Sequence, residues 1–131
     1  MMKGNCKIVD AWAQHAVHPT TFAIPSTKEL MHLKVGDYVK LGVIWKIPVT
    51  KFPARSAGGE RFWVKVTELP ILKEYARLSG AVIRGVVEQS DIHFPETHGI
   101  KDGEEITFGP PQIMAILTAR QLARERQLGL S

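Results

Sequence analysis

A ten-residue phrase occurs twice in this chain and constrains its fold: LKVGDYVKLG at residues 33–42 returns as IKDGEEITFG at residues 100–109. Each copy has an apolar residue and a lysine, then a glycine before an acidic residue and alternating apolar positions. Glycine allows backbone torsions that other residues resist, and a period of two is typical of a strand. Both copies therefore predict a tight turn that leads into a strand. Architectural repetition is the simpler interpretation, and a duplicated ligand site is the alternative.

The same alternation predicts four strands in all. They are expected within residues 37–47, 61–68, 81–89 and 104–109. Alternate apolar residues of a strand point to one face of a sheet. The residues expected to face the core are Val39, Leu41, Val43, Trp45, Ile47, Phe62, Val64, Val66, Ile83, Val87, Ile106 and Phe108, with Arg84 facing outward.

Helix signals lie outside these strands. Ser26 and Glu29 have the spacing of a capping box, in which serine caps the first turn and glutamate reaches back, so a short helix is expected over Thr27–His32. Good helix formers and a mixed apolar face predict a C-terminal helix over about residues 111–128. Residues 69–80 favour one or two helical turns, and the Pro- and Gly-rich stretch 48–60 predicts a mobile connection.

These elements predict a single α+β domain over residues 1–131. The core is a strongly curved antiparallel sheet or a small barrel, with a short N-terminal helix and a C-terminal helix. A chain of 131 residues that is 44% hydrophobic can bury one sizeable core and is short for two domains.

Composition limits the cellular location that we expect and the kinds of binding site that the chain can form. Cys6 is the only cysteine, so no internal disulfide can form and the usual zinc spacing is absent. No apolar run is long enough to span a bilayer, and the first residues lack a secretory signal, so we expect a cytoplasmic protein without a membrane partner. A net charge of +4 modestly favours anionic partners. The repeat lacks GxGxxG and GxxxxGKS/T, and its glycines precede strands, so it does not predict a phosphate loop.

The stretch from Thr21 to Ile116 resembles a family of small bacterial and phage-encoded proteins catalogued as a domain of unknown function. The family pattern is a Gly-Asp-x-Val-Lys-Leu strand followed by Gly-Glu-Arg-Phe/Met-Trp-Val. The resemblance implies an architecture with its core at about residues 21–116 and a gene on a mobile element, and it implies no activity. The residues that match the pattern are Gly36, Asp37, Val39, Lys40, Leu41, Gly59, Glu60, Arg61, Trp63 and Val64.

The residues opposite the predicted core carry the main functional hypothesis. If Phe62, Val64 and Val66 point inward, then Arg61, Trp63 and Lys65 occupy the other face. An exposed aromatic between cations is how sheet surfaces hold single-stranded nucleic acid. The candidate binding residues are Tyr38, Lys40, Lys46, Arg61, Trp63 and Lys65. The alternative is that Trp63 is buried under a helix, because large aromatic residues are mostly buried. Partial exposure of Trp63 is therefore the condition that this hypothesis must meet.

The histidines offer a weaker hypothesis. His15 and His18 have helical spacing, and residues 91–98 gather Asp91, His93, Glu96 and His98. Such clusters can bind metals, but no HExxH pattern or second cysteine supports a site, so neither a metal nor another cofactor is expected. Asp91 and His93 as an acid/base pair lack an identifiable nucleophile, and no catalytic residue is assigned.

The C-terminal helix offers a third hypothesis, a docking stripe for another protein or a second copy of this chain. Its members are Met114, Leu117 and Leu122 beside Arg120, Arg124 and Arg126. The simpler alternative is a helix that packs on its own sheet. The sequence therefore predicts a noncatalytic binding or regulatory module for nucleic acid, single-stranded more than duplex. A protein-interaction or inhibitor-type module is the alternative, and a hydrolase of unknown substrate is the second.

Overall fold

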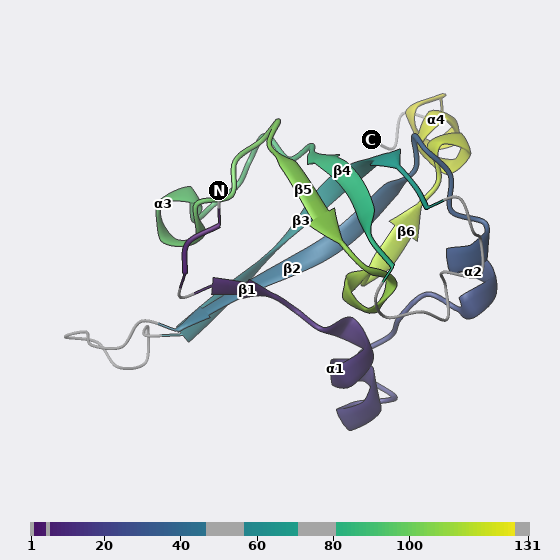
Figure 1. Cartoon of the computed structure of the whole chain (residues 1–131). Helices are drawn as coiled ribbons and strands as arrows, with labels where there is room; N and C mark the ends of the chain where they lie inside the picture. The colour runs from purple at the N-terminus through teal and green to yellow at the C-terminus, as the bar shows by residue number, and fades with distance from the viewer. Residues whose placement is uncertain (1, 5, 47–56, 71–80, 128–131) are drawn as a thin grey trace.

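The computed structural model describes residues 2–4, 6–46, 57–70 and 81–127, and in them the chain forms one curved antiparallel sheet (Figure 1). The strands are β1 (Cys6–Ile8), β2 (Tyr38–Lys46), β3 (Ala57–Glu68), β4 (Ile83–Val87), β5 (Glu105–Phe108) and β6 (Ala115–Leu117). The order across the sheet is β1-β2-β3-β4-β5, and β6 pairs with β2. The strong curvature makes a half-barrel, so the expected α+β class with a curved antiparallel sheet is confirmed.

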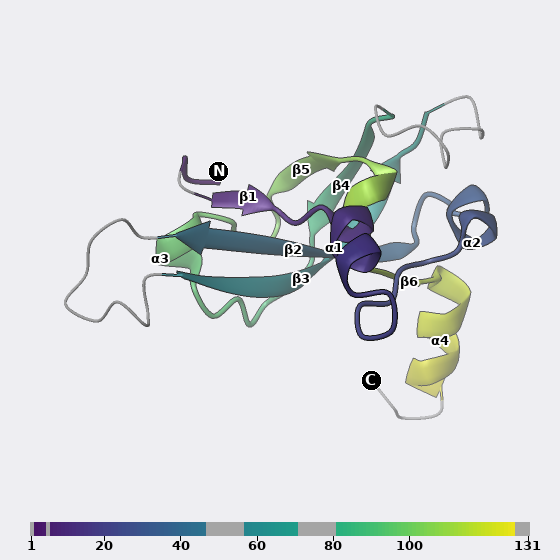
Figure 2. The ribbon, with the colours of Figure 1, turned by 90° about the horizontal axis from the view of Figure 1, so that it is seen from below.

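Four short helices accompany the sheet in the described part of the chain. They are α1 (Ala11–Val17), α2 (Thr27–Met31), α3 (Pro95–His98) and α4 (Ala119–Gln127). The capping box that predicts α2 is present: the Glu29 amide donates to Ser26 Oγ at 3.1 Å and the Ser26 amide donates to Glu29 Oε1 at 3.0 Å. Helix α4 projects from the body of the sheet beside β6 (Figure 2). None of the described helices has the length and apolar character to cross a membrane.

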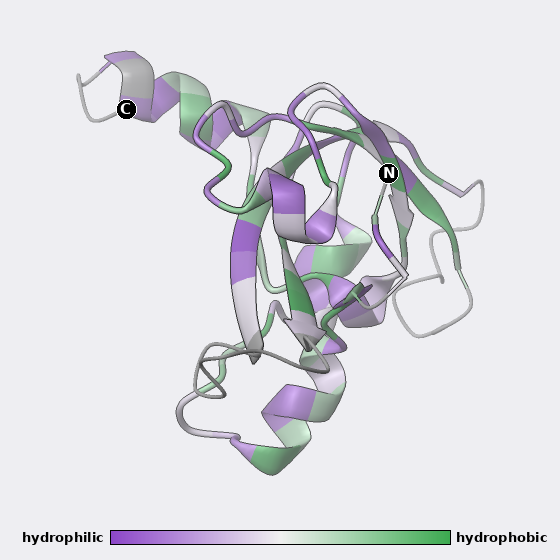
Figure 3. Ribbon diagram, turned by 90° about the vertical axis from the view of Figure 1, so that its left-hand side faces the viewer, coloured by the Kyte–Doolittle hydropathy of each residue, from purple (hydrophilic) through white to green (hydrophobic). Residues whose placement is uncertain are grey.

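The core lies on the concave face of the sheet. The alternation in β2, β3 and β4 places the expected residues there, and Phe62, Val64 and Ile83 are at most 1% exposed. Residues of α2 and of the connecting loops complete the core, among them Leu30, Leu33, Ile100 and Ile113. The other face, here called the outer face, carries the alternate residues of β2 and β3. In Figure 3, hydrophobic and hydrophilic residues both occur along the ribbon of the sheet and of the helix near the C-terminus.

The two copies of the repeated phrase form the same turn. Gly36 and Gly103 have φ of 98° and 83°, a left-handed conformation that favours glycine. The Gly36 amide donates to the Val66 carbonyl at 2.9 Å, and the Gly103 amide donates to the Val87 carbonyl at 2.7 Å. Each turn is thus fastened to the strand beside the one it enters, which confirms the architectural interpretation.

The acidic residue of each copy closes its own turn. The Lys34 amide donates to Asp37 Oδ2 at 2.9 Å, and the Lys101 amide donates to Glu104 Oε2 at 3.2 Å. These carboxylates act as local caps for the turn backbone, as short polar side chains commonly do. The spacing that the two phrases share is therefore explained by turn geometry.

The C-terminal helix begins later than expected. Residues 110–112 form a 3₁₀ turn, residues 115–117 form β6, and only residues from Ala119 onward are helical. Strand β1 pairs with Val43–Trp45 and leaves the first part of the same edge of β2 for β6. Strand pairing at this edge outweighs the helical propensity of residues 113–117, so the prediction of a helix over 111–128 is wrong in its first half.

Several expectations concern segments that the structure does not describe. The connection at 48–60 lies mostly outside the described residues, although β3 already begins at Ala57. The inward position of Ile47 and the helical turns at 69–80 also lie there, apart from residues 69 and 70.

Candidate functional site

Antiparallel pairing brings most of the predicted binding residues together on the outer face. In the register of β2 and β3, Tyr38 lies opposite Lys65 and Lys40 lies opposite Trp63. Directly opposite residues in an antiparallel pair share a face, with their Cβ atoms about 5 Å apart. Arg61 follows along β3 on the same face. Five of the six predicted residues therefore form one continuous patch.

Lys46 is the exception. It lies at the far end of β2, opposite Ala57, six residues from Lys40. At about 3.4 Å per residue, this places it about 20 Å along the strand. Its side chain is outside the described part of the chain, so the patch is defined without it.

Trp63 is half-buried, so the condition of partial exposure is met. The Lys40 ammonium lies over its ring, 4.9 Å from the centroid. This is a cation–π geometry, which holds a positive charge beside the indole and orders both side chains. The Trp63 ring therefore lies outside the core, at the surface of the sheet and against Lys40.

A hollow of about 630 Å³ opens beside Trp63 on the outer face, and we call it the first hollow. Side chains of β2 and β3 form its floor, the loop after β4 forms one wall, and residues of β6 and α4 form another. Its lining residues are Tyr38, Trp63, Lys65, Glu88, Gln89, Ser90, Asp102, Leu117 and Leu122.

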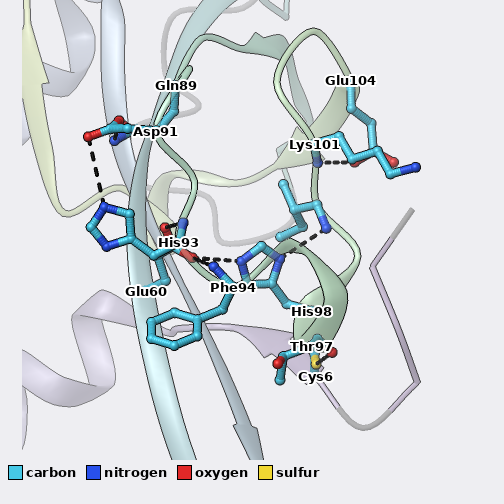
Figure 4. A network of polar contacts seen from close by, with 11 residues as sticks. Cys6, Glu60, Gln89, Asp91, His93, Phe94, Thr97, His98, Lys101 and Glu104 are labelled. Atoms are coloured by element: carbon cyan, nitrogen blue, oxygen red, sulfur yellow. Dashed lines mark hydrogen bonds and ion pairs between the residues drawn. The ribbon is translucent and has the colours of Figure 1, made fainter.

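Gln89 connects the loop after β4, which forms one wall of the first hollow, to β3 in its floor. The Trp63 amide donates to Gln89 Oε1 at 3.2 Å, and Gln89 Nε2 donates to Asp91 Oδ1 at 2.6 Å. The Gln89 amide in turn donates to Asp102 Oδ1 at 3.0 Å. The loop therefore has a defined position relative to Trp63, as preorganised sites require. Figure 4 shows Gln89 beside Asp91.

Asp37 binds the first residue of α4, the helix that contributes to the other wall of the first hollow. Its side chain is 5% exposed, and Oδ1 accepts the Ala119 amide at 2.9 Å while Oδ2 accepts the Lys34 amide. A carboxylate at the first turn of a helix satisfies an unpaired amide and complements the helix dipole. Thr118 and Gln121 cap the start of α4 locally, since the Gln121 amide donates to Thr118 Oγ1 and the Thr118 amide donates to Gln121 Oε1. Asp37 of the repeated phrase ties this capped start to β2, and Leu122 of α4 lines the hollow.

The docking stripe expected on the C-terminal helix is not a single stripe. Met114 precedes β6, is 9% exposed and packs near Gly42, and Leu117 belongs to β6. Leu117 and Leu122 both line the first hollow. Arg120 and Arg124 are exposed on α4, and the side chain of Arg126 lies outside the described part of the chain. The apolar residues of this proposed stripe therefore belong to the core and the hollow.

The first hollow has mixed charge and an aromatic floor. Lys40 and Lys65 place positive charge beside Tyr38 and Trp63, while Glu88 and Asp102 place carboxylates on the opposite wall. Such an arrangement can stack a flat ring, accept hydrogen bonds from its edge and pair an attached anionic group with a lysine. These are the contacts that a nucleotide offers.

A second polar cluster, drawn in Figure 4, joins β3 to the loop before α3. The Glu60 carboxylate accepts the His93 amide at 2.7 Å, the Phe94 amide at 3.0 Å and His98 Nε2 at 2.8 Å. Burial raises the pKa of Glu60, but the hydrogen bonds from the His93 amide, from His98 and from the Phe94 amide lower it by more, so the pKa lies below the ordinary 4.5. The carboxylate therefore stays ionised and anchors this loop.

The Glu60–His98 pair resembles a catalytic dyad only in its distance. The Ile100 amide donates to His98 Nδ1 at 3.0 Å, so Nδ1 carries no hydrogen and Nε2 donates to Glu60. Both ring nitrogens are thus engaged, and His98 is 1% exposed, so no lone pair is available to a substrate. Its role is structural.

The Asp91–His93 pair and the metal-binding hypothesis do not lead to a candidate site either. His93 Nε2 and Asp91 Oδ2 are 4.0 Å apart, beyond hydrogen-bond reach, and both side chains are about 70% exposed. Within the described residues, no group of three or more His, Cys, Asp or Glu side chains is arranged to hold a metal ion.

Sequence reasoning named Leu117 and Leu122 only as docking residues of the C-terminal helix and missed the other wall residues of the first hollow. Gln89, Asp102 and Leu122 come from three segments that are distant in sequence, and no local pattern relates them to Trp63. Glu60 was noted only as part of a family pattern, and its contacts with residues 93–98 depend on tertiary structure.

No family model, curated protein or solved structure matches the chain. Its function is therefore inferred from the geometry of the outer face.

Proposed function

We propose that this protein is a noncatalytic binding module that holds single-stranded nucleic acid on the outer face of β2 and β3, in the cytoplasm. The observation that carries the proposal is the strand register, which places Tyr38 opposite Lys65 and Lys40 opposite Trp63. Two aromatic rings and two lysines then share one small surface. Stacking on aromatic rings beside phosphate-pairing cations is the common mode of single-strand binding on sheets.

Single strands suit this surface better than duplexes. Bases in a duplex are stacked on one another and cannot lie against Tyr38 or Trp63 without being unpaired. The first hollow, at about 630 Å³, accepts one ring system with part of its backbone. The carboxylates of Glu88 and Asp102 are acceptors for the amino groups on the edge of a base. Their negative charge also repels the phosphates of a strand that would run along that wall.

The test is fluorescence anisotropy with a labelled single strand of about 12 nucleotides, with the matching duplex as comparison. We expect the single strand to bind more tightly and to dissociate as salt rises. Three phosphate contacts, from Lys40, Lys65 and Arg61, predict a slope of log K against log salt of about −2, and Lys65→Ala reduces it by about 0.7. Lys28→Ala is the matched control, because Lys28 is an exposed lysine on α2.

Substitutions of Trp63 test the contribution of the aromatic floor to binding. Trp63→Ala removes one stacking platform, which is worth about 1–3 kcal/mol per base, so affinity falls by roughly 5- to 150-fold. Trp63→Phe keeps a ring and retains most of the affinity. If no single strand binds the folded protein even at low salt, the proposal is refuted and the outer face becomes a candidate protein interface.

A further inference from the structure

A second hollow, of about 390 Å³, lies on the same outer face further along β2 and β3. Its lining includes the outward residues Gly42, Gly59 and Arg61, together with Phe22, which follows α1. The register continues without a break from the first hollow: Lys65, Trp63, Arg61 and Gly59 alternate along the outer side of β3. The two hollows are therefore neighbours on one sheet surface.

Two outward positions that line the second hollow are glycines. Gly42 lies opposite Arg61, and Gly59 lies opposite Ile44. A Cβ on Gly42 would meet Met114 Sδ at 3.0 Å, so Met114 already fills the space that a side chain would take. Met114 and the two glycines therefore line this part of the hollow, while neighbouring outward positions on the same strands carry large side chains.

Phe22 and Arg61 repeat the arrangement of Trp63 and Lys40. The Arg61 guanidinium lies 5.9 Å from the centroid of the Phe22 ring, and the Phe22 side chain is half-buried while Arg61 is exposed. Arg61 and Trp63 are two residues apart on β3, which is about 7 Å along the strand. Each nucleotide brings one base and one phosphate. Two consecutive pairs of an aromatic ring and a cation therefore match two consecutive nucleotides.

We infer that the bound strand runs on past Trp63 into the second hollow, where Phe22 stacks a further base and Arg61 pairs its phosphate. This inference rests on the proposed function, and it assigns a path and a minimum ligand length to the same surface. From Lys65 to Gly59 the path covers six residues of β3, which is about 20 Å. A path of this length holds about four nucleotides, the lower end of the range for small sheet-based binding domains.

The test measures affinity against length with oligothymidylates of about two to about 12 nucleotides on the full chain. We expect affinity to rise steeply up to about four nucleotides and only slightly beyond. Phe22→Leu keeps an apolar side chain and removes the aromatic ring. We expect it to weaken binding of strands of two or more nucleotides roughly tenfold and to leave binding of thymidine monophosphate, which occupies the first hollow alone, unchanged. Trp63→Ala weakens binding at every length.

The outcomes separate this inference from the function on which it rests. If Trp63→Ala weakens binding but Phe22→Leu binds all lengths like the native chain, the path does not enter the second hollow and the proposed function stands. If the native chain binds no strand of any length, both are overturned. Circular dichroism of each variant, with Lys28→Ala as the control for loss of charge, shows whether the fold is retained.

Discussion

Removal of the Glu60 carboxylate tests whether one buried acceptor holds residues 93–98 against β3. In Glu60→Ala, His98 Nε2–H loses its acceptor at a site where the ring is 1% exposed. A buried donor without a partner costs about 2 kcal/mol. The amides of His93 and Phe94 belong to exposed residues, so water replaces the carboxylate and each loss is about 1 kcal/mol. The free energy of unfolding should therefore fall by about 4 kcal/mol.

Urea denaturation followed by tryptophan fluorescence measures this loss. Trp45 is a local reporter, because its ring lies 5.4 Å from the Phe94 ring and 5.7 Å from the His98 ring, centroid to centroid. Glu29→Ala is the matched control: its carboxylate accepts one backbone amide in an exposed capping box, and its removal should cost below about 1.5 kcal/mol. The reasoning is refuted if Glu60→Ala is destabilised no more than Glu29→Ala.

The same pair of proteins predicts a pH dependence. The pKa of Glu60 is lowered in the folded state, so its stabilisation is complete above the ordinary value of 4.5 and is lost as pH falls through the lowered pKa. The stability difference between the native chain and Glu60→Ala should therefore narrow as pH is lowered from 4.5. A difference that stays constant or widens in that range contradicts the assignment of an ionised, hydrogen-bonded carboxylate.

Three further substitutions test the turns and the close packing of the sheet. Gly85→Ala should cost about 2 kcal/mol in urea denaturation, because its Cβ would meet Val64 Cγ1 and, at 2.7 Å, the Lys65 carbonyl oxygen; a neutral result would contradict this packing. Gly103→Ala should cost about 1–2 kcal/mol because φ is 83°, whereas Gly4→Ala, with open space around it, should change stability little; equal effects would argue against turn strain. Asp37→Asn replaces one acceptor oxygen with a donor facing an amide, so hydrogen exchange at Ala119 should accelerate; unchanged protection would show that Asp37 does not hold α4.

Local signals were sufficient wherever the structure is made by neighbours in sequence. The Ser26–Glu29 spacing alone places α2, since both hydrogen bonds of the capping box lie within four residues. The alternation in β2 and β3 separates core residues from outer ones, because successive side chains of a strand must point to opposite faces. For the same reason the candidate residues Trp63 and Lys65 could be assigned to the outer face before any partner strand was known.

Pairing between distant segments decided the rest. Propensity favoured a helix at residues 113–117, but the uncovered edge of β2 takes those residues as β6. The sequence placed His98 only in the candidate cluster at residues 91–98, and the contact with Glu60, 38 residues earlier, shows that it is a buried structural residue. The walls of the first hollow likewise come from β6, α4 and two loops. For β2, β3, β4 and β5, the sequence by itself determined which residues are strand or outward-facing and where the two glycine turns lie, because those properties depend on backbone sterics and side-chain periodicity. Which of them meet was decided by the tertiary structure, because strand register and loop anchoring depend on hydrogen bonds and packing between residues far apart in the chain.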